Sequence, residues 1–408
     1  MRALATMFGA LGRSDFRWWF ATQVLSASGT VTQGVAVSWL VLRLDSNALL
    51  LALVTVCTMA PLIPLGPWAG SLVDHVDRRR LLMLTQSLLA TLSFLLAVLV
   101  ATDTIQLWML FTISFASGSV TAIDAPARQV FVRDLVGGQG VASAVSLNEV
   151  VVNVSRVLGP SLGGVLLSTA GITWCFVANA LSFVAPLIVL LFTVTRAETI
   201  DRPAREPGAV LAGLRYVAGQ PAILACIVLA AAAGMLFNLG VALPVLATSV
   251  WHLDGAGFGT LMAAFGIGAL PGAVMAATTT RPTGQRVRVL AIATGLSVLI
   301  VGYTPQLVIG YAGMALAGFT SIWFIATANT LVQLDAAPAM RGRVMGVWTM
   351  ALPGMLPVTS LTAGGITEWL GPQTGFAASG VAVLITVAAG WRALGRHVSS
   401  EEPSTLTS

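Results

Sequence analysis

Four side chains that could carry chemistry share one face of an apolar segment, residues 148–164. Glu149, Asn153, Arg156 and Pro160 follow one another at spacings of four, three and four. Such spacings place side chains on one face of a helix. An ionised side chain near the centre of a bilayer costs about 2.5–3.5 kcal/mol on insertion scales, so it normally faces protein or water and serves a pathway. The segment therefore predicts a polar stripe that contains both an acid and a base.

Glu149 is the candidate for proton coupling in this stripe. Coupling requires an acid whose protonation responds to burial and to neighbouring charges, and Arg156 lies two turns further along the same face. The alternative is a static buried pair of Glu149 and Arg156, bridged by Asn153. The spacing is compatible with both interpretations.

The composition requires a membrane around these residues. Of the 408 residues, 56% are hydrophobic and only 9% are charged, whereas soluble domains carry about 25% charged residues. The mean hydropathy is +0.88. All 21 basic residues are arginines, which excludes a P-loop lysine and lysine catalysis, and with them ATP-driven transport by this chain alone.

Runs of about 20 apolar residues, long enough to cross about 30 Å of hydrocarbon, can be placed twelve times. The predicted spans are 17–43, 48–73, 80–101, 106–127, 141–169, 172–195, 221–250, 256–279, 286–304, 306–334, 343–367 and 372–394. All arginines except Arg43 and Arg156 then fall on one side. This bias predicts a multi-pass protein of the cytoplasmic (inner) membrane with both termini in the cytoplasm, and it explains the pI of about 9.8 without nucleic acid as a partner.

Tryptophans are expected at the two membrane interfaces. At the inner interface we expect Trp18, Trp19 and Trp391, and at the outer interface Trp39, Trp108, Trp174, Trp251 and Trp369.

The two halves of the chain resemble each other. The run D-A-P-A-R at 124–128 parallels D-A-A-P-A-M-R at 335–341, and such internal repeats are typical of transporters. We predict an all-α membrane protein with 12 transmembrane helices in two pseudo-symmetric six-helix bundles. The predicted parts are an N-terminal bundle (1–195), a cytoplasmic linker with a short amphipathic helix (196–219), a C-terminal bundle (220–395) and a flexible cytoplasmic tail (396–408).

The turn between the second and third spans reads GSLVDHVDRRRL over residues 70–81. Its acid and arginines can form charge-assisted hydrogen bonds across a tight turn. The turn resembles the signature loop of the major facilitator superfamily, although His75 stands for an arginine and Asp77 for a glycine. The matching positions are Gly70, Leu72, Asp74, Arg78 and Arg79.

This resemblance implies a gating latch. It implies that Asp74 caps a helix of the opposite half and joins a relay with Arg78 and with an acid that ends span 4, here Asp124. The chain departs from the superfamily at Ser114, where span 4 would carry an arginine. The second-half counterpart, at 268–282, keeps its glycines but lacks the acid.

The outer half of span 5 carries a second motif, consisting of Gly159, Pro160, Gly163 and Gly164. Small residues at this spacing let helices approach closely. The run resembles the motif of drug and proton antiporters, which implies a seam that closes the outer leak path. Residues from 126 through span 6 further resemble the branch that holds macrolide efflux proteins and the enterobactin exporter.

The resemblance implies a substrate cavity lined by spans 1, 4, 7 and 10, near the midplane. An apolar cavity with a few amides and aromatic rings suits an amphipathic organic molecule, although each polar side chain could equally join two helices. The candidates, together with Asn153, are Thr30, Gln33, Phe237, Asn238, Trp323 and Asn329, and Trp348 could also stack on a ligand.

We therefore predict a proton-coupled exporter of hydrophobic or amphipathic small molecules such as drugs. The alternatives are a siderophore exporter of the same branch and a uniporter or importer of a native metabolite. We expect no cofactor, no metal and no enzymatic activity, because His75, His252 and His397 fall in loops or the tail and Cys57, Cys175 and Cys226 lie far apart. The expected partners are the small-molecule substrate, protons and lipid, and we expect a monomer.

Overall fold

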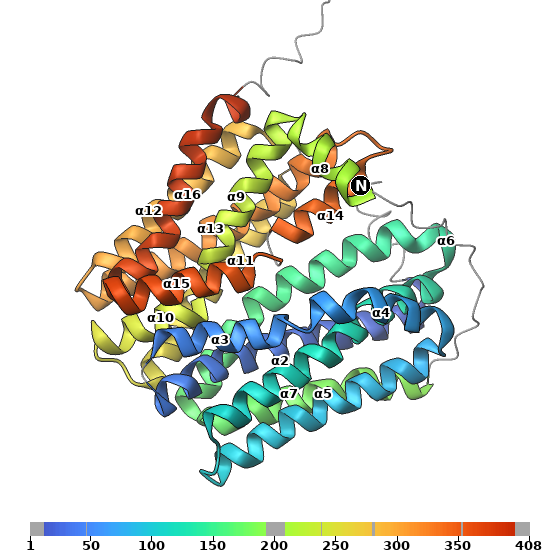
Figure 1. The fold of residues 1–408 in the computed structure, drawn as a ribbon, viewed down its shortest axis with the longest axis horizontal. Coiled ribbons are helices and arrows are strands. Elements are labelled where there is room, and N and C mark those ends of the chain that lie inside the picture. Colours follow the sequence, from blue (N-terminus) through green and yellow to red (C-terminus); the bar gives the residue numbers. More distant parts are fainter. Residues whose placement is uncertain are drawn as a thin grey trace, which may run out of the picture. The chain divides into compact units, whose positions relative to one another are not determined.

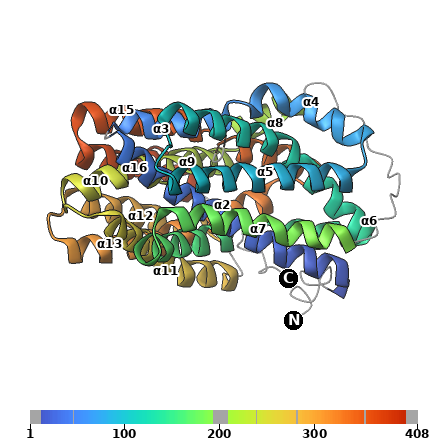
Figure 2. The ribbon, with the colours of Figure 1, turned by 90° about the horizontal axis from the view of Figure 1, so that it is seen from below.

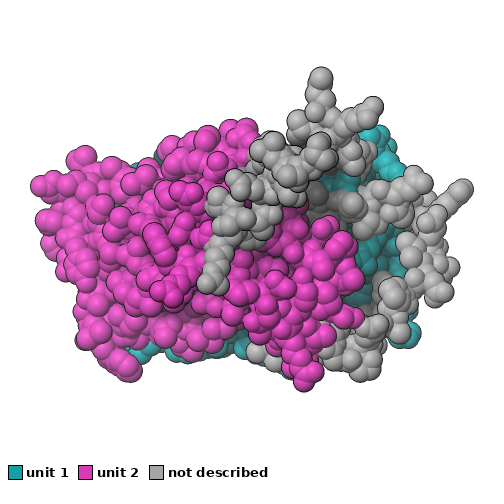
Figure 3. Space-filling view, turned by 90° about the horizontal axis from the view of Figure 1, so that it is seen from above, with its two compact units in different colours: residues 1–202, 253–266 teal, residues 203–252, 267–408 magenta. Residues whose placement is uncertain are grey.

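The computed structural model describes residues 12–45, 47–192, 209–237, 239–279, 282–351 and 354–395, which fold almost entirely into helices (Figure 1). No described residue lies in a strand, which confirms the predicted all-α membrane fold. The chain divides into two units (Figure 3). Unit 1 comprises residues 1–202 and 253–266, and unit 2 comprises residues 203–252 and 267–408.

The helices follow the predicted spans. The first six are α2 (Ser14–Leu44), α3 (Ala48–Met59), α4 (Leu62–His75), α5 (Arg78–Ala101), α6 (Leu107–Thr169) and α7 (Ile172–Phe192). The others are α8 (Ala209–Ala218), α9 (Pro221–Phe237), α10 (Leu239–Ser249), α11 (Gly255–Thr278), α12 (Gly284–Tyr303), α13 (Leu307–Asp335), α14 (Arg341–Ala351), α15 (Leu356–Leu370) and α16 (Pro372–Gly395).

Ten helices of the described chain are long and apolar enough to cross a membrane. α6 supplies two of them, because Gly137 interrupts it with φ +64°, a left-handed conformation that favours glycine. The predicted spans 48–73 and 221–250 each correspond to two shorter helices, α3 with α4 and α9 with α10. The described helices are thus compatible with the predicted twelve spans.

Local sequence signals set several of these helix ends. Asn47 caps α3 by accepting from the amide of Leu49 at 2.8 Å, and Asp77 caps α5 by accepting from the amides of Arg79 and Arg80. Such side chains satisfy amides that have no partner in the first turn. Pro61 separates α3 from α4, since its ring removes a backbone donor.

In unit 1, α2 packs on α6 and α7, and α5 packs on the same two helices (Figure 2). One apolar cluster lies where α2 and α5 begin, an end that also carries Arg13, Arg78 and Arg79 and that we call the basic end of unit 1. The largest rings of this cluster are Trp19 and Phe131, whose centroids are 4.9 Å apart. Residues of this cluster come from α2, α5 and α6, among other helices, so the cluster packs these three helices together.

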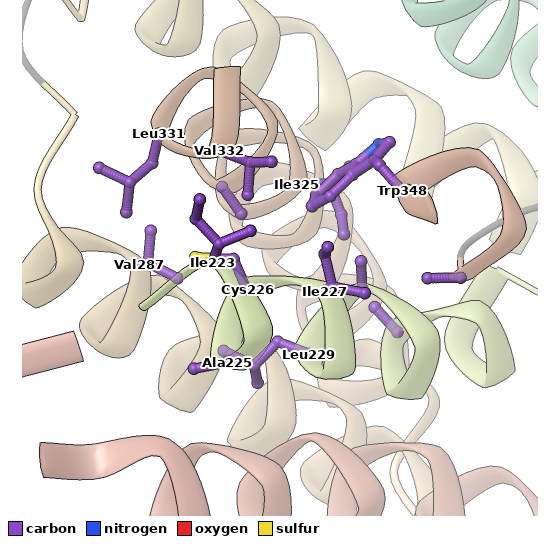
Figure 4. Packing of buried hydrophobic residues seen from close by; sticks show 14 of the residues in the cluster. Ile223, Ala225, Cys226, Ile227, Leu229, Val287, Ile325, Leu331, Val332 and Trp348 are labelled. Carbon is purple, nitrogen blue, oxygen red and sulfur yellow. The ribbon is translucent and has the colours of Figure 1, made fainter. Parts of the chain in front are cut away.

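In unit 2, residues of α9, α12, α13, α14 and α16 build one apolar core (Figure 4). Trp348 is only 5% exposed within it, and Figure 4 shows its indole beside Ile325. The short helix α8 lies at 112° to α9 and inserts Val217 into the same core. Its Tyr216 hydroxyl accepts from the amide of Ala337 at 3.1 Å, which ties α8 to the loop after α13.

Two of the tryptophans predicted at membrane interfaces are buried in the protein. Trp19 is 1% exposed and packs on Phe131. Trp251 donates its indole N–H to the carbonyl of Thr304 at 3.2 Å and is 9% exposed. Both rings therefore pack against other helices of their unit, and their depth in the membrane stays a prediction.

Candidate functional site

The first turn of α5 joins three helices at the basic end of unit 1. Arg78 binds the carboxylate of Asp134 on α6 at 2.8 Å, and Asp134 is only 6% exposed. Arg79 donates to the carbonyls of Leu190 and Leu191 at 2.6 and 2.8 Å, at the C-terminal end of α7. These two arginines of α5 therefore hold it to α6 and to α7.

Asp134 is the acid that Arg78 contacts at the end of span 4, and not Asp124 as the resemblance implied. Gly137 ends this part of α6 just after Asp134, whereas Asp124 lies almost three turns deeper. The backbone of Gly70 and Asp74 lies in α4, but the side chain of Asp74 lies outside the described part of the structure. The capping role implied for Asp74 stays a prediction.

Asp124 occupies a separate buried site between α2, α5 and α6. Its side chain is fully buried. One carboxylate oxygen accepts from the hydroxyl of Thr85 at 2.7 Å and from the amide of Gln86 at 2.9 Å, and the other accepts from Arg128. Arg128 in turn donates to the side-chain oxygen of Gln23 at 2.6 Å. The carboxylate thus has a counter-ion and two neutral donors.

Sequence reasoning found Asp124 but not its neighbours. Asp124 and Arg128 are four residues apart, which places them on one face of α6, so this pair was readable from the sequence. Gln23, Thr85 and Gln86 are single polar residues in apolar helices, and only the packing of α2 and α5 on α6 brings them to the ion pair. Buried charges are normally paired and hydrogen-bonded in this way.

The polar stripe of span 5 lies on the second part of α6. Arg156 is half-buried there, and the side chains of Glu149 and Asn153 lie outside the described part of the structure. Both interpretations of the pair stay predictions.

The glycines of span 5 form two close seams within unit 1. A Cβ at Gly159 would lie 2.6 Å from Cγ1 of Val31, and one at Gly163 would lie 3.1 Å from Cβ of Val35, so these two glycines admit α2. The hydroxyl of Thr32 donates to the Gly159 carbonyl at 3.1 Å across the same seam.

Gly164 faces the other way, toward α11. A Cβ at this position would meet the backbone of Gly259, which belongs to the part of α11 in unit 1. Pro160, between the two seams, is buried inside α6. The motif thus carries backbone-to-backbone packing, as small residues in membrane helices do.

The cavity candidates of span 1 make contacts inside unit 1. Gln33 accepts from the amide of Asn179 on α7 at 2.8 Å, and Asn179 also donates to the hydroxyl of Ser93 at 3.1 Å. Thr30 is exposed in the described structure and donates to the carbonyl of Ser26 in its own helix. Gln33 therefore joins α2 to α7, while the side chain of Thr30 is exposed.

The candidates of unit 2 divide in the same manner. Asn329 accepts from Gln333 at 2.5 Å within α13, and both are half-buried. Trp323 donates its indole N–H to Thr279 at 3.3 Å and packs at the edge of the core with Phe237. Trp348 is a core residue, which removes it from the candidates for stacking on a ligand, and Asn238 lies outside the described residues.

Comparisons with known proteins identify relatives along nearly the whole chain. Residues 5–406 match the family described as transmembrane secretion effector. The staphyloferrin A transporter of Staphylococcus aureus is 25% identical over 377 residues, which cover 90% of this chain and 93% of that protein. The enterobactin exporter EntS of Citrobacter koseri is 28% identical over 328 residues, which cover 78% of this chain and 76% of that one.

Solved transporter structures share the fold. A bacterial homolog of the human lysosomal transporter Spinster aligns with a TM-score of 0.69 over 94% of this chain and 96% of its own, at 14% identity. A bacterial homologue of the iron transporter ferroportin aligns with a TM-score of 0.67 over 94% of this chain and 99% of its own, at 16% identity. At these identities the likeness concerns the fold alone.

Proposed function

Because the chain belongs to the transmembrane secretion effector family of the major facilitator superfamily, we propose that it exports an amphipathic secreted metabolite of the siderophore class by alternating access. One observation carries the substrate class. The two relatives described above are a siderophore transporter and a siderophore exporter, and they align with this chain over most of its length.

Hydrophobic drugs are the second candidate substrate class. The polar groups that unit 2 offers near span 10 are amides and an indole, namely Asn329, Gln333 and Trp323. Neutral groups of this kind among apolar walls accept amphipathic molecules of varied shape. They offer no cluster of cations for a phosphate or a dicarboxylate.

The driving force in this proposal is a proton gradient. The candidates for proton coupling in unit 1 are Glu149, with Arg156 on the same helical face, and Asp124 beside Arg128. Each lies close in sequence to an arginine, and an acid of this kind can exchange a proton as its surroundings change. In the same proposal the protein is a monomer of the inner membrane with both termini in the cytoplasm, as the arginine distribution favours.

The test is transport by the purified full chain in proteoliposomes. A pH gradient is imposed, and flux is followed for enterobactin, staphyloferrin A, a macrolide, a tetracycline and a cationic dye. We expect gradient-dependent flux of at least one siderophore. Flux of only the drugs would favour the second substrate class, and no gradient-dependent flux of any compound would refute proton-coupled export.

Glu149→Gln tests the role of the stripe. Loss of the titrating group should abolish gradient-driven flux and preserve counterflow of labelled against unlabelled substrate, because exchange at equal pH needs no net proton movement. Glu368→Gln at the exposed end of α15 is the matched control and should behave as wild type. Gradient-driven flux at the wild-type rate in Glu149→Gln would remove Glu149 from the coupling mechanism.

A further inference from the structure

Four buried polar atoms in the Asp124 site, or one turn of α2 from it, have no partner among the described residues. They are the Nε1 of Trp19, the Nε2 of Gln23, the Oε1 of Gln86 and the Nε of Arg128. Trp19, Gln23 and Gln86 are at most 5% exposed. Buried polar groups in native proteins nearly always have a partner, from the protein or from ordered water.

Rotating the side-chain amides of Gln23 and Gln86 by about 180° does not give these unpaired atoms partners. Gln23 must present oxygen to Arg128, which can only donate, and Gln86 must present nitrogen to the carboxylate of Asp124, which can only accept. The free end of Gln23 is therefore an N–H donor, and the free end of Gln86 is a carbonyl acceptor.

The helices bring these free atoms into a common region. Gln23 is bonded to Arg128 and Gln86 to Asp124, so both amides flank one ion pair. The free N–H groups of Gln23 and Arg128 can each donate to a water, and the free carbonyl of Gln86 can accept from a water. Internal waters typically make two to four such bonds in polar sites.

The unpaired atoms also follow the helices toward the basic end. α2 runs antiparallel to the first part of α6, because Arg13 binds the Leu135 carbonyl at 2.9 Å and Trp19 packs on Phe131. The free N–H of Trp19 belongs to the turn of α2 that precedes Gln23, on the same helical face. Unsatisfied groups therefore occur at two successive levels between Asp124 and this end.

Exposure follows the same order. The Asp124 side chain is 0% exposed, whereas that of Arg128, one turn nearer the basic end, is 26% exposed. Among the described side chains, the charged group that contacts Asp124 is Arg128, and the pair of Arg78 and Asp134 lies further toward the basic end. α4, which also packs on α6, ends with Asp74 and His75. α5 and α2 face it with the neutral groups of Thr85, Gln86 and Gln23, and α3 and α7 contain no charged residue.

We propose that Gln23, Gln86, Arg128 and Trp19 bind a short file of internal water that connects the buried carboxylate of Asp124 to the basic end of unit 1. The water completes the hydrogen bonds of the four atoms and provides the route by which a proton from that end reaches Asp124. Water binding stands on the geometry alone, while the role in proton delivery rests on the proposed proton-coupled export.

Radiolytic hydroxyl-radical labelling of the full chain in detergent tests water binding. Radicals formed from bound water modify neighbouring side chains even when these are buried. Phe131, 1% exposed beside Trp19, should be labelled several-fold more than Phe176, which is 0% exposed in the same unit. Gln23→Met should lower labelling of Phe131, whereas Gln333→Met, which removes an amide from α13, should not. Equal labelling of Phe131 and Phe176 in the wild type would overturn the proposal.

Proteoliposomes test proton delivery with enterobactin as the probe. Gln23→Met should slow gradient-driven flux several-fold more than counterflow, because only the former needs net proton movement. An equal effect on both modes would overturn the role in proton delivery. A wild-type protein without enterobactin flux would count against the proposed substrate, and labelling of Phe131 would still decide whether the site holds water.

Discussion

Gly159→Ala tests whether the seam between α2 and α6 is as close as the structure places it. A Cβ at residue 159 would lie 2.6 Å from Cγ1 of Val31 and 3.1 Å from the carbonyl oxygen of Ser28. Carbon atoms in contact are about 3.5–4.0 Å apart, so the two helices must separate by about 1 Å. Overpacking of this kind costs about 1–3 kcal/mol of unfolding free energy.

The control for this prediction is Gly34→Ala on α2, where an added Cβ meets no atom within 4 Å. Both substitutions replace a helical glycine by alanine, so the gain in helix propensity is similar and cancels in the comparison. Unfolding in mixed detergent micelles, followed by circular dichroism, should give a free energy about 1–3 kcal/mol lower for Gly159→Ala than for Gly34→Ala.

Val31→Gly completes the test as a rescue. It removes both the Cβ and the methyl groups of Val31 that the new Cβ would meet, so in the Gly159→Ala background it should cost less than it does alone, and the coupling should be about 1 kcal/mol or more. Two outcomes would contradict the close seam. They are equal stability of Gly159→Ala and Gly34→Ala, or strict additivity of Gly159→Ala with Val31→Gly.

Two further predictions concern the ion pair at the basic end of unit 1 and the bond between α8 and the loop after α13. Asp134→Asn leaves Arg78 without its counter-ion and should lower the unfolding free energy by about 1.5–3 kcal/mol, whereas Arg80→Gln at the neighbouring exposed ion pair should cost less than about 0.5 kcal/mol. Equal melting temperatures of these two variants would contradict the buried pair. Tyr216→Phe removes the acceptor for the Ala337 amide and should cost about 1 kcal/mol. Amide hydrogen exchange at Ala337 should accelerate, and unchanged exchange there would show that α8 is not docked through this bond.

The helices were predictable because their signals are long and local. Apolar runs predicted the spans, and the break at Gly137 falls between the predicted spans 106–127 and 141–169. The separation of α3 from α4 at Pro61 was not predicted, because 48–73 was assigned as one span. The division of the chain into the two units was harder to predict from the sequence. Residues 253–266 belong to unit 1 although they follow the linker, and close packing of Gly164 on Gly259 is a tertiary contact that no local pattern encodes.

The candidate sites divide along the same line. Asp124 with Arg128 was visible as a pair on one helical face, but the partner of Arg78 was assigned to the wrong acid. Asp124 and Asp134 both lie near the end of span 4 in sequence, and the choice depends on where the helix ends, at Gly137. Gln33 was predicted as a cavity residue. Its bond to Asn179 arises from the packing of α2 on α7, which the sequence of α2 alone does not reveal.

Arg79 has two roles, which the arginine-only composition does not distinguish. It adds positive charge at this end of the unit, and it binds the carbonyls of Leu190 and Leu191. Its guanidinium brings positive charge to the C-terminal end of α7, where the helix dipole is negative. Two donors of one planar group reach two carbonyls, a geometry that the single ammonium of lysine does not reproduce. A lysine at residue 79 would preserve the positive charge but not these two bonds to α7. At this residue, charge and helix anchoring are separable by a substitution that leaves the net charge unchanged.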